Sequence, residues 1–285
     1  MLTPEVQTRT LTSQSSGPGA RAARTRPLTA GVGQTSHRFR GATLIPERYL
    51  YFVTSLPERE RYQQTELLVP DLRMESDDEG KVVVYYAPVE WRNPEARLAI
   101  VGVTPGFTQM EIAVRVARRE LLAGADPDTA CRRAKYAACF AGPMRQNLVS
   151  MLDGLKLSEF LGCAAEALFT TSSHLLHATS AVCFPVFVNG QNYTGSRPRL
   201  IRSGFLMKYV REKLAPELAS LRRAALLPLW KAVEEALQVL EAEGLIPAGR
   251  TLYGFPHPSG ANGHRTRQYE DSKRALSEAL RCALE

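Results

Sequence analysis

The apolar run Leu98–Val103 is the part of the sequence that most limits the possible folds. It contains no polar side chain, and the Gly/Pro turn of residues 104–106 follows it at once. A run of this kind, bounded by turn residues, is typical of a strand that is buried on both faces. Such strands belong to parallel sheets that carry helices on both sides. The sequence therefore predicts an α/β fold.

Helical periodicity follows this strand and recurs later in the chain. Between residues 107 and 122 the apolar side chains repeat at helical spacing on Ile112, Ala113, Val116, Ala117 and Leu121, and Gly124 ends the helix. A second helix is expected from Met144 to Leu161, and a last one from about Gln268 to Leu284.

Further strands are expected at residues 174–188, 225–230 and 249–255, in alternation with the helices. This alternation favours a three-layer αβα sandwich around a central, mainly parallel sheet of four strands. Two β-rich runs at residues 49–53 and 82–89, separated by the acidic turn of residues 75–81, predict extra strands on its N-terminal side.

Charge and composition divide the chain at residue 40. Residues 1–40 contain six arginines and one acidic residue, so they supply +5 of the net charge of +7. They have no apolar period, and we expect a disordered basic tail there and a single folded domain in residues 41–285. The tail either holds DNA nonspecifically or acts as a solubilising leader. The folded part carries little excess charge, so a DNA surface on it must be local.

The remaining composition suggests a soluble protein of the cytoplasm. No apolar run approaches a membrane span, and the N-terminus does not have the pattern of a secretory signal. Five widely spaced cysteines predict reduced, buried thiols and no metal clip. We expect no cofactor, no membrane association, no obligatory protein partner and a monomer.

Two turns stand where ligands bind in parallel sheets, at the carboxyl ends of predicted strands. The first is GVTPGF, Gly102–Phe107, and the second is HPSGANG, His257–Gly263. Together with FAGPMRQNLVSML from Phe140 and LLPLWKAVEEAL, Leu226–Leu237, they occur in the order and spacing of the uracil-DNA glycosylase superfamily. The chain resembles this family over roughly residues 97–284.

The resemblance implies a DNA N-glycosylase that rotates a nucleotide into a pocket and leaves an abasic site. It implies that His257 donates a hydrogen bond to the leaving base, on which negative charge collects. It also implies that Phe140 stacks on the base. The other interpretations are a loop histidine with a structural hydrogen bond and a phenylalanine of the core.

Further residues follow from the same resemblance. Those expected to contact the base are Gly102, Val103, Pro105, Phe107 and Thr179, with His177 and Ser180 as neighbours of Thr179. Those expected to contact DNA are Ser259, Gly260, Ala261, Asn262, His264 and Arg265, joined by Arg267. A solvated basic turn is the alternative for the last three.

The sequence departs from the family at two positions. Thr104 stands where the family has Asp or Asn; it can orient a water molecule but cannot act as a general base. Glu111 is the nearest acidic alternative. Thr179 stands near the base-reading asparagine, and a hydroxyl cannot grip uracil as an amide does. The stretch between Phe107 and Phe140 is also longer than in most branches, which predicts a wider pocket or a lid.

These departures leave several functions open. The first is a glycosylase for a modified pyrimidine, for example the glucosylated hydroxymethylcytosine of some phage genomes, which would make it an antiviral defence enzyme. The second is a uracil-DNA glycosylase of base excision repair. The third is a catalytically silent DNA-binding module. A nucleotide-binding α/β enzyme is the weakest alternative, because the sequence has neither a P-loop nor a G-x-G-x-x-G turn.

Overall fold

A parallel sheet of three strands lies at the centre of the fold, and its middle strand is the predicted apolar run. The computed structural model describes residues 44–139, 143–259 and 262–285. In it β3 (Leu98–Gly102) lies between β4 (Leu176–Ser180) and β7 (Ala225–Pro228), and Leu98 is level with both Leu176 and Ala225. Residues 98–101 have no exposed surface. The prediction of an α/β fold with a doubly buried strand is confirmed.

The predicted fourth strand of this sheet, residues 249–255, is reduced to a single bridge. Thr251 pairs with Leu226 in parallel, with Leu226 N donating to Arg250 O (2.7 Å) and Leu252 N donating to Leu226 O (2.8 Å). The chain then turns at Gly254, which has a φ of +84°. The expectation of a four-stranded sheet is therefore wrong, because the backbone leaves the sheet before a second pair can form.

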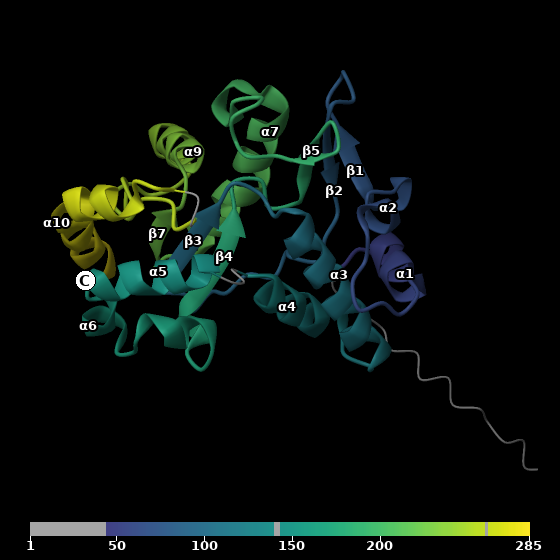
Figure 1. The fold of residues 1–285 in the computed structure, drawn as a ribbon, viewed down its shortest axis with the longest axis horizontal. Coiled ribbons are helices and arrows are strands. Elements are labelled where there is room, and N and C mark those ends of the chain that lie inside the picture. The colour runs from purple at the N-terminus through teal and green to yellow at the C-terminus, as the bar shows by residue number, and fades with distance from the viewer. Residues whose placement is uncertain (1–43, 140–142, 260–261) are drawn as a thin grey trace, which may run out of the picture. The chain divides into compact units, whose positions relative to one another are not determined.

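Helices cover both faces of the parallel sheet (Figure 1). Ala99 and Val101 of β3 belong to one core cluster, which α3 (Phe107–Leu122), α4 (Pro127–Ala138) and α9 (Lys231–Ala242) complete. Leu98 and Ile100 point to the other face and join a second cluster with α5 (Pro143–Gly154), α6 (Leu157–Leu161) and α10 (Arg265–Leu284). Alternate residues of one strand thus supply two separate cores.

A second, antiparallel sheet has the strand order β1-β2-β5-β6. Its strands are β1 (Arg73–Ser76), β2 (Val82–Tyr85), β5 (Val186–Val188) and β6 (Gln191–Asn192). The acidic turn joins β1 to β2, with Asp77 Oδ1 accepting from the backbone of Lys81 and Val82. Of the two extra strands expected, the run at residues 82–89 contains β2, whereas β1 was not expected. Residues 174–188 do not form one strand as expected. They divide between the two sheets, as β4 and β5.

The run at residues 49–53 is helical, which corrects the expectation of a strand. It lies in α1 (Glu47–Ser55), where Tyr49 and Val53 are four residues apart and both buried. The Tyr49 ring stacks on Tyr86 of the chain following β2, with ring centroids 3.7 Å apart. Five aromatic and aliphatic residues in a row satisfy either period, so packing against α3 and Tyr86 decides the structure.

Other boundaries also differ. The helix expected over residues 144–161 is divided into α5 and α6 at Lys156, whose φ of +59° is left-handed. The last helix begins at Arg265, three residues earlier than expected. The remaining helices are α2 (Gln64–Leu67), α7 (Gly204–Tyr209) and α8 (Ala215–Ser220), with a π-helical turn at Val210–Leu214 and short 3-10 turns at Pro70–Leu72, Ala165–Phe169, Ser173–Leu175 and Leu200–Arg202.

All described residues belong to one compact unit, which spans Gly41–Glu285. The predicted basic tail, residues 1–40, lies outside the described residues, as do Phe140, Gly260 and Ala261.

Candidate functional site

A cavity of about 320 Å³ lies at the carboxyl ends of the three parallel strands. The chain brings β3, β4 and β7 to one edge of the sheet, so the residues that end or follow these strands meet there. These lining residues are Gly102, Val103, Thr104, Pro105, Ala178, Thr179, Ser180, Leu229 and Trp230. His257 joins them from the loop before α10, and Lys135, Ala138 and Cys139 join them from the end of α4. The volume is within the usual range of small-molecule sites, about 300–1,000 Å³.

The structure brings most of the predicted base-binding residues to this cavity. Gly102, Val103, Pro105 and Thr179 line it. Phe107 does not; it begins α3, its N–H donates to Asn192 Oδ1 (2.8 Å), and its ring packs on the core cluster shared with α3. The predicted stacking residue, Phe140, is not among the described residues.

His257 presents a hydrogen-bond donor at the cavity. Its Nδ1 accepts from the backbone N–H of Ser259 (3.2 Å), which assigns the proton of the neutral ring to Nε2. Burial lowers the pKa of His257, so the neutral ring predominates near pH 7. The indole of Trp230 meets the imidazole edge to face, with centroids 4.7 Å apart and planes 88° apart. A neutral Nε2–H donor is suited to an acceptor that gains negative charge.

Hydrogen bonds to three backbone carbonyls fix the His257 loop. Asn147 Nδ2 donates to Pro258 O (2.8 Å), Arg265 Nη1 to Ser259 O (2.8 Å) and Asn262 Nδ2 to His257 O (3.3 Å). Two residues predicted to contact DNA, Asn262 and Arg265, therefore also brace the loop that carries His257.

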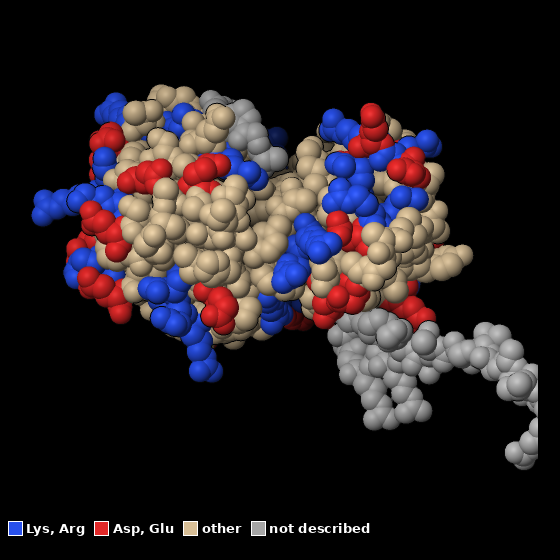
Figure 2. Space-filling view, turned by 90° about the horizontal axis from the view of Figure 1, so that it is seen from below, with Lys and Arg blue, Asp and Glu red and all other residues tan. Residues whose placement is uncertain are grey.

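The basic residues next to the His257 loop differ in their availability to a phosphate group. His264 is exposed at the start of α10, while Arg267 lies 3.8 Å from Asp271 in an exposed ion pair. Figure 2 shows basic and acidic side chains interspersed on one face of the protein, with no single basic patch on it. This distribution agrees with the small excess charge of the folded part.

Thr104 lines the cavity, but its hydroxyl is used within the protein. The Oγ1 donates to Phe184 O (2.7 Å) and accepts from Val186 N (3.1 Å), which ties the turn after β3 to the start of β5. The hydroxyl proton therefore has a partner. In this geometry Thr104 can accept a hydrogen bond from a water molecule but cannot donate one to it.

The acidic alternative, Glu111, does not line the cavity. Its side chain is 2% exposed, and its Oε1 accepts from Arg115 Nε (2.7 Å) and from Tyr62 N (3.3 Å). None of the described residues that line the cavity is an aspartate or glutamate. The described wall of the cavity therefore offers the donors His257 and Lys135 but no carboxylate base.

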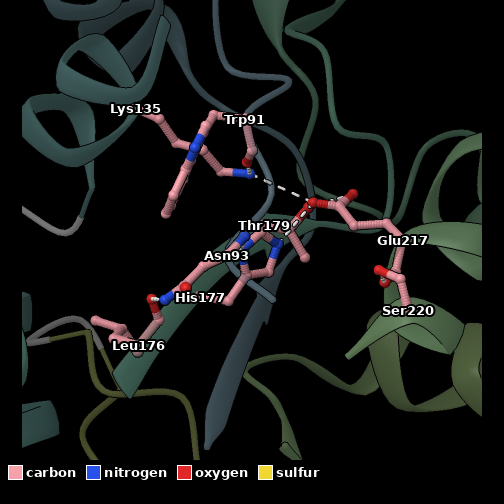
Figure 3. Close-up of polar contacts among 8 residues, drawn as sticks. All are labelled: Trp91, Asn93, Lys135, Leu176, His177, Thr179, Glu217 and Ser220. Carbon is pink, nitrogen blue, oxygen red and sulfur yellow. Dashed lines mark hydrogen bonds and ion pairs between the residues drawn. The ribbon is translucent and has the colours of Figure 1, made fainter. Parts of the chain in front are cut away.

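A buried ionic network lies along the cavity at Lys135 and Thr179, and we name it the Glu217 wall (Figure 3). Three side chains converge on the carboxylate of Glu217, in α8: His177 Nε2 lies 2.7 Å from Oε1, Lys135 Nζ lies 3.3 Å from Oε1, and Thr179 Oγ1 donates to Oε2 (3.1 Å). Lys135 and Thr179 also line the cavity, whereas Glu217 and His177 lie behind them.

The charges of the Glu217 wall follow from these contacts. Burial alone would raise the pKa of Glu217, but the Lys135 ammonium and the His177 hydrogen bond hold it at about 2. Burial and the neighbouring Lys135 lower the pKa of His177, so this ring is neutral. Its Nδ1 accepts from Asn93 N (3.3 Å), which leaves the proton on Nε2 for Glu217. The wall is thus an ion pair between the Lys135 ammonium and the Glu217 carboxylate, and His177 and Thr179 each donate a further hydrogen bond to that carboxylate.

Sequence reasoning reached only His177 and Thr179 of this wall and missed Lys135 and Glu217. Lys135 lies 82 positions from Glu217, and His177 lies 40 positions from it, so no spacing motif joins them. Lys135 belongs to α4, in the long stretch between Phe107 and Phe140 for which a wider pocket or a lid was expected. The extra length of this stretch is visible in the sequence. Which of its residues reaches the cavity depends on packing, which the sequence does not show.

Two cysteines of the cavity are poor nucleophiles. Burial raises the pKa of the Cys139 thiol to about 12, and it also raises that of Cys183. All five cysteines are free, as predicted, but only Cys131 is fully buried; Cys139, Cys163 and Cys183 are half-buried, and Cys282 is exposed. Within residues 44–139, 143–259 and 262–285, no group of three or more His, Cys, Asp or Glu side chains is placed to hold a metal ion.

A second hollow, of about 780 Å³, adjoins the cavity and shares Trp230 and His257 with it. Trp230 is 42% exposed, so its indole is accessible between the two spaces. Ser259 and Asn262 line the second hollow together with Lys231, Glu234, Gln268 and Asp271. The polar groups there are mixed in charge, and room for more than one base-sized ring is available next to His257.

Comparison with known proteins places the chain in a family. It is 38% identical over 221 residues to the uncharacterized protein YoxB of Bacillus subtilis (strain 168), a match that covers 76% of this chain and 86% of YoxB. The chain therefore belongs to the YoxB family. No family model and no solved structure matches it. In the described part of the chain, no helix has the length and apolar character needed to cross a bilayer.

Proposed function

We propose that the protein is a DNA N-glycosylase that excises a modified pyrimidine from DNA. The observation that carries the proposal is the neutral His257, which carries its proton on Nε2 and lines a cavity of the right size at the carboxyl ends of a parallel sheet. The motifs shared with uracil-DNA glycosylases support it, since their segments after β3 and before α10 meet at this cavity.

The reaction would proceed by heterolysis of the glycosidic bond. The electron pair of the C1′–N1 bond passes to the base and spreads to its O2, where the Nε2–H of His257 stabilises it. The sugar becomes an oxocarbenium ion, a water molecule adds to C1′, and the proton of that water is lost to solvent. Because no carboxylate lines the described cavity, stabilisation of the leaving base accounts for the catalysis.

Two kinds of pyrimidine fit a cavity with this donor. One is a modified cytosine, including glucosylated hydroxymethylcytosine, and the other is a uracil-type base, including uracil itself in base excision repair.

The test uses purified protein and duplex DNA that contains uracil, hydroxymethylcytosine or glucosylated hydroxymethylcytosine, followed by alkali to break abasic sites. Strand breaks with one substrate are expected, and His257→Ala should reduce their rate by roughly 100- to 1,000-fold, as loss of a transition-state donor does. His174→Ala, which changes a histidine outside the cavity, is the matched control and should cleave like the unchanged protein.

A catalytically silent DNA-binding module is the second candidate. The contacts of Thr104 favour it, because its hydroxyl proton is committed to Phe184 O and no acidic residue replaces it in the described wall. Binding of DNA without strand breaks on any substrate, unchanged by His257→Ala, would establish this module in place of the glycosylase.

A further inference from the structure

Two polar side chains of the Glu217 wall, Lys135 and Thr179, line the cavity, and each can make one further hydrogen bond. Lys135 is 8% exposed, and two of its three ammonium protons have partners, Trp91 O at 2.6 Å and Glu217 Oε1 at 3.3 Å. In the described part of the chain the third has no acceptor. Thr179 donates its hydroxyl proton to Glu217, so its oxygen can only accept. The cavity therefore offers a charged donor beside a hydroxyl acceptor.

A buried lysine is costly unless it is paired, and a pair of well-packed apolar residues would serve stability as well. The ammonium is nevertheless held at the surface of a cavity, by a carboxylate that three donors keep ionised. Figure 3 shows Lys135 of α4 and His177 and Thr179 of β4 converging on Glu217. This arrangement fixes the position of the ammonium and leaves one proton for a ligand.

The strand order sets which edge of a base this wall meets. The sheet runs β4-β3-β7, with the Thr251 bridge beyond β7, so the His257 loop and β4 lie on opposite sides of β3. The N1 of the base carries the sugar and faces out of the cavity, so a pyrimidine with its O2 at His257 turns N3 and the 4-substituent inward, and we place that edge against β4. Thr179 is on β4 itself, and Lys135 arrives from α4 beyond it (Figure 1). N3 then meets the acceptor Thr179, and the 4-substituent meets the donor Lys135.

We propose that Lys135 and Thr179 determine specificity by reading a 4-oxo, N3–H pyrimidine edge, with Glu217 and His177 as positioning residues. Lys135 donates to the 4-oxygen, and Thr179 accepts from N3–H. A cytosine-type base presents a 4-amino donor to the ammonium and an N3 acceptor to the hydroxyl oxygen, so both pairs are mismatched. This inference rests on the proposed glycosylase function and narrows its substrate to uracil-type bases, including those modified at the 5-position.

The first experiment compares rates of strand breakage on four DNAs that contain uracil, 5-hydroxymethyluracil, 5-hydroxymethylcytosine or its glucosylated form. The protein should cleave at the two 4-oxo bases, and Lys135→Met should lower the ratio of 4-oxo to 4-amino cleavage by roughly 10- to 100-fold, as loss of a charged hydrogen bond does. Preference for a 4-amino base, or an equal loss of rate on all four DNAs, would overturn the proposal.

A second measurement does not depend on cleavage. Binding of free uracil and free cytosine is followed by ligand-observed NMR, and uracil should bind better by a margin that Lys135→Met removes. If no DNA is cleaved but this preference is present, the glycosylase proposal fails and the specificity proposal stands. If free uracil and cytosine bind alike, or neither binds, the specificity proposal fails.

Two further variants separate specificity from folding. Lys135→Met/Glu217→Gln removes both charges together, so no buried charge is left unpaired, and it should also lose the preference for uracil. Lys208→Met removes a lysine that pairs with Glu75 (3.0 Å) away from the cavity, and it should keep that preference. A double variant that folds and still prefers uracil would refute the role of Lys135.

Discussion

The two polar sides of the cavity are built in different ways. The His257 loop is a short segment whose half-buried, neutral ring and backbone carbonyls are held by hydrogen bonds from Ser259, Asn147 and their neighbours. The Glu217 wall is a buried ion pair that joins β4, α4 and α8. This difference means that side chains of the His257 loop can be substituted without affecting the core, whereas those of the Glu217 wall are part of the core. Substitutions on the two sides should therefore separate activity from stability.

The largest effect is expected from Glu217→Ala. It leaves the Lys135 ammonium buried without its carboxylate and removes the acceptor of His177 and Thr179. The free energy of unfolding should fall by roughly 3–5 kcal/mol, the usual effect of breaking a buried pair on one side. Urea denaturation measures this change.

The control for Glu217→Ala is Glu243→Ala, at an exposed pair with Arg211 whose side chains are 36% and 42% exposed. An exposed pair contributes about 0–1 kcal/mol, so this variant should stay close to the unchanged protein. Equal losses in the two variants would remove the distinction between the wall and ordinary surface pairs.

Thr104 follows β3, between the two sides of the cavity. Thr104→Val tests whether its hydroxyl serves stability or cleavage. Valine keeps the shape but leaves Phe184 O and Val186 N without their partner, so the free energy of unfolding should fall by about 1–3 kcal/mol. Thr170→Val, at a threonine with one long hydrogen bond to Glu166 O (3.4 Å), should change little. A stable Thr104→Val protein that has lost cleavage would instead indicate that Thr104 orients the water.

The parts of the fold that could be predicted are those whose sequence pattern lies within one short segment. The strand Leu98–Val103 is recognisable because its apolar run and its Gly/Pro turn are both local, and the same holds for α3 and α9. The His257 loop is recognisable because its motif is contiguous. Residues 49–53 have a pattern that fits either period, and residues 249–255 look like a strand although only one pair forms. Lys135 and Glu217 meet only through tertiary packing, so nothing in their spacing indicates the wall.

A smaller effect is expected when the support of the His257 loop is weakened from outside. Asn147→Ala removes the hydrogen bond to Pro258 O, and a bond of this kind contributes about 0.5–1.5 kcal/mol to the free energy of unfolding. If the proposed glycosylase depends on a fixed His257, the rate of cleavage should fall by a larger factor than this loss of stability implies. A rate that is unchanged would show that the loop keeps His257 in place without Asn147.

Acid should weaken the fold in two windows, an upper one set by the histidines His257 and His177 and a lower one set by Glu217. A histidine with a lowered pKa in the folded protein contributes stability that is complete above its usual value of 6.5 and is lost as the pH falls through its folded pKa, because the unfolded chain takes up the proton first. Glu217, with a pKa of about 2 in place of 4.5, contributes stability that is present above pH 4.5 and is lost as the pH falls toward 2. The free energy of unfolding should therefore decline in two separate windows.

The smallest expected effect is the His257 share of the upper window, which His257 divides with the fully buried His177. His257→Ala should remove only that share and leave the window between pH 4.5 and 2 intact, because the Glu217 carboxylate has no contact with the His257 loop. Urea denaturation at pH 7.5, 5.5 and 3 measures both windows. A His257→Ala protein that loses as much stability as the unchanged protein between the first two values would mean that burial does not keep His257 neutral in the folded state.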